Sequence, residues 1–328
     1  MRKYTFLTAG IFVFLFSGCA VLSDSQVQNI NAFSVTASHY SNYPDEIFKK
    51  RAELHLDNQL LEIISFSDFN LLDRRIDKAR ANFNAAMATS DKFDLSIQII
   101  QQYAGLLVEL SSDKYTQGLD DKTTGLSNNL GILVSAFNTR VKASDTLPVA
   151  ISGELSNVIW ALGRRITRNK QAQALKKFIP MGNVLVAATI KNLVEVLDRD
   201  SIQGNDGKVF PGLKTLLAEE KAECIQNYRN LVFNGQSPNN YLTIRQYYDI
   251  KIDYDNTEAL RQKCVTTANQ LAKAHDALAK NMTEKKDLKG LIKETQDLVS
   301  DFQDLGKIAS NYAPDIQIKL SDLLNHLK

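Results

Sequence analysis

Glycine and proline are scarce in this chain of 328 residues, which holds 15 glycines and 6 prolines, together about half of the usual share. This scarcity excludes turn-dense all-β folds, collagen-like chains and disordered chains rich in these residues. A strong excess of one charge is also missing, since 39 Lys and Arg oppose 37 Asp and Glu. Dedicated DNA-binding domains usually carry a basic excess, so no nucleic-acid partner is expected.

Motifs for catalysis or metal binding are missing as well. The sequence has neither a His-Glu-x-x-His nor a Cys-x-x-Cys motif, and no two of its histidines lie three or four residues apart: His39, His55, His275 and His326. Gly-x-Ser-x-Gly elbows and phosphate-binding Gly-rich loops do not occur. Two acidic stretches, 198–206 and 249–255, lack the spacing of a calcium loop. We therefore predict no metal, no cofactor and no enzymatic activity.

The first residues carry a targeting signal. Met1-Arg2-Lys3 is basic, and the apolar run from Phe6 to Phe16 spans about a dozen residues, whereas a membrane helix needs roughly 20. A short basic segment before a short apolar run is typical of a secretory signal peptide that is removed on maturation.

The residues Phe16-Ser17-Gly18-Cys19 resemble the lipobox of bacterial lipoproteins, although that family prefers Leu where this chain has Phe16. The resemblance implies that residues 1–18 are removed and that Cys19 receives a diacylglyceryl group and further acyl chains such as palmitate. It also implies that Ala20 after the cysteine allows release to the outer membrane. More than one acyl chain gives stable attachment to a bilayer. We expect a protein anchored to the outer membrane and facing the periplasm.

The tether behind the anchor is expected to be short. Ser23-Asp24-Ser25 is a helix-start signature that follows closely after Cys19. We therefore expect a lipidated tether over 19–25 and a single helical-bundle domain over 26–328, with a candidate subdivision near 200–211. The folded body should lie against the membrane.

Long heptad-like runs dominate that body. The longest predicts one helix from about 69 to 112, with seam positions four and three residues apart and one polar exception, Ser90: Leu72, Ile76, Ala79, Phe83, Ala86, Ser90, Phe93, Ile97, Ile100, Ala104 and Leu107. Similar runs cover 264–282, where His275 lies on the seam and should be buried, and 291–312. Strand alternation is not comparable, so the expected fold class is all-α.

Short loops are expected at about 113–121, 144–148, 200–211 and 234–238. Long helices joined by short loops are mostly antiparallel neighbours, so we predict an elongated up-and-down helical bundle with long coiled-coil-like antiparallel helices. Pro180 lies inside a helical stretch and predicts a break or a kink there, because proline lacks the N–H and clashes with the preceding turn.

Two features of this bundle leave alternatives open. The apolar segment 178–197 could insert into a membrane as in helical pore-forming toxins, but its polar residues favour a central bundle helix: Pro180, Asn183, Lys191, Asn192 and Glu195. Cys224 and Cys264 could form a disulfide only if residues 234–254 were irregular. That segment looks helical, which favours two buried free thiols.

One stretch has a local excess of positive charge. No Asp or Glu lies between Glu154 and Glu195, and this stretch supplies a candidate basic binding patch: Arg164, Arg165, Arg168, Lys170, Lys176 and Lys177. Such a patch suits phosphate headgroups or an acidic partner surface. Alternatively, acidic residues of a neighbouring helix neutralise it: Glu219, Glu220, Glu223 or Asp198.

These observations favour a lipid-anchored periplasmic helical scaffold or adaptor that binds a protein partner in an outer-membrane or envelope assembly. A first alternative is a helical pore-forming or membrane-remodelling protein that uses segment 178–197. A second alternative is an envelope enzyme, such as a cell-wall hydrolase, which would need a cleft with several titratable groups of shifted pKa.

Overall fold

The computed structural model describes residues 22–64, 71–87, 91–112, 119–140, 146–147, 157, 168–203, 209–233, 241–284 and 287–312. The described part is predominantly helical, which confirms the all-α prediction. Its helices are α1 (Asp24–Tyr40), α2 (Pro44–Ile64), α3 (Leu72–Met87), α4 (Asp91–Ser111), α5 (Leu119–Asn138), α7 (Arg168–Asp198), α8 (Leu213–Phe233), α9 (Tyr241–Glu284) and α10 (Leu288–Tyr312). Two short strands, β1 (Ser201–Gln203) and β2 (Val209–Pro211), pair antiparallel where the sequence predicts only a loop.

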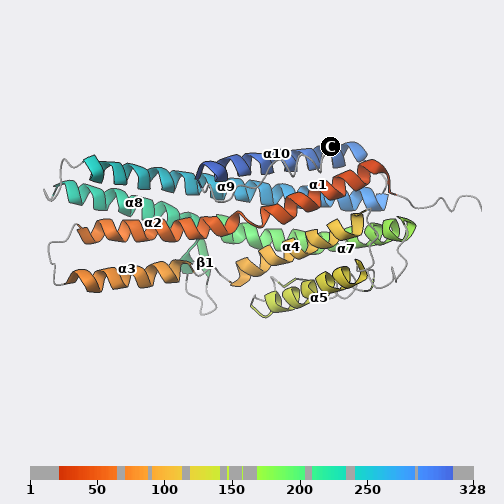
Figure 1. Cartoon of the computed structure of the whole chain (residues 1–328), viewed down its shortest axis with the longest axis horizontal. Helices are drawn as coiled ribbons and strands as arrows, with labels where there is room; N and C mark the ends of the chain where they lie inside the picture. Colours follow the sequence, from red (N-terminus) through yellow and green to blue (C-terminus); the bar gives the residue numbers. More distant parts are fainter. Residues whose placement is uncertain are drawn as a thin grey trace, which may run out of the picture.

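The helices lie along the long axis of the molecule (Figure 1). The 44-residue α9, about 66 Å long at 1.5 Å per residue, contacts α7, α10, α2, α8 and α1. Helix pairs α2–α3, α4–α5 and α9–α10 pack as sequence neighbours. In contrast, α2 continues along the row of α1, and α8 along the row of α7 (Figure 1). These two pairs do not fold back on themselves as they would in a simple up-and-down bundle.

The single helix predicted over 69–112 is wrong, because α3 ends at Met87 and α4 begins at Asp91. The two helices have different neighbours: α3 packs against α2, whereas α4 packs against α1, α5 and α7. The polar exception of the heptad run, Ser90, lies between them, outside the described residues. In sequence terms, a serine followed by aspartate is favoured at a helix start, a signal that the apolar seam conceals.

Of the break or kink predicted at Pro180, the break is wrong, because α7 is helical from Arg168 to Asp198 with Pro180 inside it. A proline inside a helix costs about 3 kcal/mol. The two residues before it, Phe178 and Ile179, are fully buried, and α7 packs against both α9 and α4. We attribute the continuity of the helix to this packing, which outweighs the local penalty.

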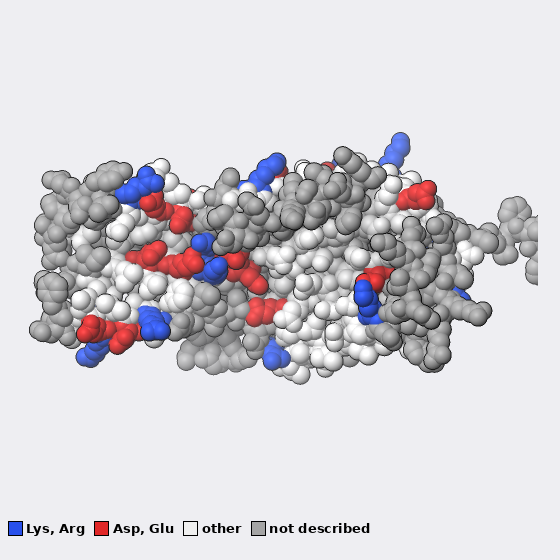
Figure 2. Space-filling model, viewed as in Figure 1, with Lys and Arg blue, Asp and Glu red and all other residues white. Residues whose placement is uncertain are grey.

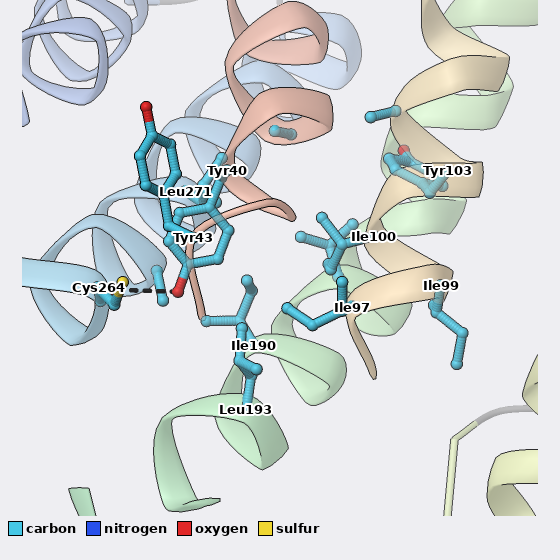
Figure 3. Packing of buried hydrophobic residues seen from close by; sticks show 14 of the residues in the cluster. Tyr40, Tyr43, Ile97, Ile99, Ile100, Tyr103, Ile190, Leu193, Cys264 and Leu271 are labelled. Carbon is cyan, nitrogen blue, oxygen red and sulfur yellow. Dashed lines mark hydrogen bonds between the residues drawn. The ribbon is translucent and has the colours of Figure 1, made fainter. Parts of the chain in front are cut away.

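The core of the molecule lies where α1, α4, α7 and α9 meet (Figure 3). There the hydroxyl of Tyr40 donates a hydrogen bond to the carbonyl of Cys264 at 3.0 Å. Cys224 and Cys264 are buried free thiols, and α9 is helical from Tyr241, as the sequence favours. The residues of 178–197 contribute to this core. Segment Asn169–Asp198 is long and apolar enough to cross a membrane by length and composition alone, a test that core helices of soluble proteins also pass.

The contact between α4 and α7 depends on a glycine, and this gives a stability prediction. A Cβ at Gly182 would lie 2.2 Å from the Oη atom of the buried Tyr103. Gly182→Ala should therefore lower the free energy of unfolding by about 1–3 kcal/mol, measured by urea unfolding with circular dichroism.

Gly125→Ala in α5 is the matched control, because a Cβ there meets nothing within 4 Å. Alanine favours a helix over glycine, so this variant should gain up to about 1 kcal/mol. Equal stability of the two variants would contradict the close approach of Tyr103 to α7.

Candidate functional site

The structure describes only part of the predicted basic patch. Arg164 and Arg165 lie outside the described residues, and of Arg168 only the backbone is described. Lys170 and Lys177 are exposed on the same face of α7, seven residues apart, whereas the half-buried Lys176 points about 100° away from Lys177. Lys191 lies on the same exposed face as Lys170 and Lys177, about four helical turns beyond Lys177. We call Lys170, Lys177 and Lys191 the lysine stripe.

Two of the acids that could neutralise the patch are engaged elsewhere. Glu220 accepts a hydrogen bond from Nη2 of Arg51 at 2.6 Å, and Asp198 accepts one from Nη1 of Arg261 at 2.8 Å. Val184 lies on the same face as the lysine stripe and is 57% exposed. The described part of the patch is therefore a mixed surface of lysines and an apolar side chain on α7.

A buried polar network, which the sequence does not reveal, joins three helices in the core. Nε2 of His275 in α9 lies 2.8 Å from Oη of Tyr103 in α4, and its Nδ1 lies 2.9 Å from Oδ1 of Asn183 in α7. Nδ2 of Asn183 donates to Asp276 at 3.1 Å, and Asp276 forms an ion pair with Lys280 at 2.5 Å. A chain of polar contacts thus leads from the core to the surface.

The partners of His275 define its protonation. The amide oxygen of Asn183 accepts only, so Nδ1 carries the proton and Nε2 accepts from the hydroxyl of Tyr103. Burial lowers the pKa of His275 to about 3, against a small opposing effect of the charge on Asp276. The prediction of a buried seam histidine is confirmed, since His275 is 0% exposed. Its neutral ring is fully hydrogen-bonded, which suits a structural role.

A second polar cluster joins α2 to α8 in the other half of the molecule. Glu220 lies between Arg51 and His55, whose Nδ1 is 3.3 Å from Oε1 of Glu220. Four atoms of this cluster have no hydrogen-bond partner among the described residues: Nε of Arg51, Nδ1 of His55, Oε1 of Gln59 and Oε2 of Glu220. The guanidinium of Arg51 already neutralises the carboxylate of Glu220. This ion pair links α8 to α2.

Two carboxyl groups between α2 and α9 have shifted acidity. Burial, and then the mutual repulsion of the two groups, raises the pKa of Asp57. The pKa of Asp253 is raised by burial as well, and Lys50 opposes this shift. Neither side chain lines the three cavities described for this molecule, which lie between α2 and α3, between α1 and α10, and between α9 and α10.

Comparison with known proteins adds no relative to this picture. No family model, no curated protein and no solved structure matches the chain. Within the described ranges, no group of three or more His, Cys, Asp or Glu side chains is placed to hold a metal ion.

The neutral His275 predicts a pH dependence of stability. Its pKa is lowered in the folded state from 6.5 to about 3, so its contribution is complete above pH 6.5 and is lost as the pH falls towards 3. Between pH 7 and pH 5 this site should lower the free energy of unfolding by about 2 kcal/mol.

Urea unfolding at both pH values, for the wild type and for His275→Gln, measures this loss. The raised pKa values of Asp57 and Asp253 act in the opposite direction in both proteins, so the difference between the two proteins isolates His275. The same pH slope in the wild type and in the variant would rule out a buried neutral histidine.

Proposed function

We propose that this chain is a lipid-anchored helical scaffold that holds a protein partner in an assembly at the periplasmic face of a bacterial outer membrane. The proposal combines the lipobox at Cys19 with the way in which the first helix begins. It assigns no reaction to the chain. The bundle itself would be the functional unit, because it keeps a binding surface at a fixed distance from the membrane.

The start of α1 is the observation that carries this proposal. The side chain of Ser23 accepts from the backbone N–H of Gln26 at 3.2 Å, and the side chain of Gln26 accepts from the N–H of Ser23 at 3.0 Å. This capping box fixes the first turn. The amide of Gln26 also donates to Asn281 near the end of α9 at 2.7 Å. The helix is thus capped locally and tied to the body.

The distance between anchor and body is therefore small. Residues 20–23 alone separate Cys19 from α1, and even fully extended they span about 14 Å. α1 begins at one end of the elongated body (Figure 1). An anchor at Cys19 would hold this end at the membrane, while α9 extends for about 66 Å towards the other end.

An uncharged surface supports the binding of a partner. On the face in Figure 2, the surface over α4 and α5 is largely uncharged, whereas acidic and basic side chains gather beyond it. The sequence of α5 has no charged residue from Thr123 to Asn138, and Ile132 within it is 66% exposed. Exposed helix faces of monomers usually carry charges, and the centres of protein interfaces are depleted of them. This α5 face is therefore the partner surface that we propose.

A crosslinking experiment in cells tests the scaffold. A photo-crosslinking residue at position 132 of the full-length lipoprotein should capture one partner in stoichiometric amounts, identified by mass spectrometry. The same residue at position 244, where Ile244 of α9 is 47% exposed, is the control and should not capture it.

The Cys19→Ala chain, brought to equal expression, should lose at least nine-tenths of this adduct because it is no longer held at the membrane. If the protein is recovered without a partner from both positions, in the wild type and in Cys19→Ala alike, the scaffold proposal is contradicted. Liposome leakage by the chain would then be the next assay, because it reports the pore-forming alternative. That alternative requires α7 to leave its contacts with α4 and α9.

The lysine stripe predicts how an acidic partner would respond to charge reversal. Lys177→Glu with Lys191→Glu should reduce recovery of the captured partner about threefold or more at low salt, and less at high salt, because surface charges steer association. Lys251→Glu on the exposed side of α9 is the matched control and should have no effect. An equal loss with the control substitution would show that the stripe has no specific role.

A further inference from the structure

A groove between the first and last described helices has the features of a binding site. It is lined by residues of α1 and α10, extends for about 16 Å along α10, and encloses about 390 Å³. That volume lies in the range of ligand pockets. The groove begins at Ser25, close to the end of the body that the proposed anchor would hold.

Unused hydrogen-bonding groups converge on this groove. Thr295 is 4% exposed, and its Oγ1 has no hydrogen-bond partner among the described residues. Leaving a buried hydroxyl without a partner costs about 1–3 kcal/mol, so the position invites a ligand. Nearby, the side chains of Gln28, Gln296 and Gln303 also line the groove and make no hydrogen bond to described residues.

The chemistry of the lining selects the class of ligand. Seven of the ten lining residues carry an amide or a hydroxyl, and none carries a charge. A charged ligand would lose hydration there without gaining a counter-charge, and an acyl chain would bury the amides unpaired. Amides and hydroxyls both donate and accept, as sugar hydroxyls and N-acetyl groups do. Ile292 and Val299 offer apolar contact to the C–H faces of a sugar ring.

We propose that the α1–α10 groove binds an uncharged, N-acetylated oligosaccharide, of the kind that forms the glycan strands of a bacterial cell wall. The assignment to the cell wall rests on the proposed periplasmic location. A saccharide fits better than a peptide, because an extended peptide usually pairs with a strand edge and a helical peptide needs a hydrophobic groove, whereas this groove lies between two helices and is mostly polar. The scaffold would then contact the wall close to its anchored end.

A titration with a defined sugar tests the groove. The detergent-solubilised full-length lipoprotein is titrated with the tetramer of N-acetylglucosamine in a calorimeter, and saturable binding is expected. Thr295→Val removes the buried hydroxyl with little change in volume and should weaken binding about five- to tenfold. Thr295→Ser restores the hydroxyl and should bind within about twofold of the wild type.

Two further variants guard against effects on folding. Gln296→Leu changes an exposed groove residue and should weaken binding without altering thermal unfolding. Gln246→Ala changes an exposed glutamine of α9 outside the groove and should leave binding unchanged. No binding by the wild type, or binding by Thr295→Val and Gln296→Leu that is as tight as that of the wild type, would overturn the proposal.

Cosedimentation separates the saccharide from a peptide ligand. Intact cell-wall sacculi, whose lactyl groups are amide-linked and uncharged, should retain the lipoprotein, soluble N-acetylglucosamine oligomers should compete, and free stem peptides should not. Competition by the peptides alone would overturn the saccharide assignment in favour of a peptide. These assays contain neither membrane nor partner protein. If no saccharide binds but position 132 captures a partner, only the glycan site is contradicted. If saccharide binds but position 132 captures no partner, only the scaffold proposal is contradicted.

Discussion

The burial of α9 among five other helices is the constraint on which the rest of the structure depends. Apolar packing alone leaves the register of long helices poorly defined, because neighbouring turns offer similar surfaces. Polar contacts of α9 with its neighbours define this register at several points along the helix. Arg261 is 2% exposed and bonds the carbonyl of Leu197 and the side chain of Asp198 at the end of α7, while Glu258 neutralises it in its own helix. A slip of one turn would separate this buried guanidinium from Leu197 and Asp198 and leave Nη1 without these acceptors, which is unfavourable.

The same helix links the three surfaces that matter for the proposed function. Gln26 ties the start of α1 to Asn281, Lys263 pairs with Asp301 of α10 at 2.7 Å, and His275 meets Tyr103 of α4, the helix that carries α5. The start of α1, the groove and the uncharged α5 face are therefore positioned from one element. A scaffold needs such fixed relations more than it needs reactive groups, since its partner and its ligand must meet surfaces at constant separation.

Local signals explain which features of the fold could be predicted from the sequence. Ser23 with Gln26 is a capping box that needs no tertiary information, and helical periodicity identifies the all-α class, the burial of His275 and the free thiols. Tertiary packing explains the failures: buried neighbours keep α7 continuous at Pro180, and different partners separate α3 from α4. The groove joins Gln28 to Thr295, which are distant in the chain, so no spacing rule could reveal it. Of the predicted basic patch, only the lysines have described side chains.

The breaks between helices coincide at one level of the molecule. α1 ends at Tyr40, which bonds to Cys264, and α7 ends at Asp198, which bonds to Arg261, so both rows stop within one turn of α9. At this level α9 and α10 continue without interruption, because Lys263 of α9 pairs with Asp301 in the middle of α10, which extends to Tyr312. Bending stiffness at this waist therefore comes mainly from these two helices. Under a load applied between the two ends of the molecule, bending would concentrate at the waist.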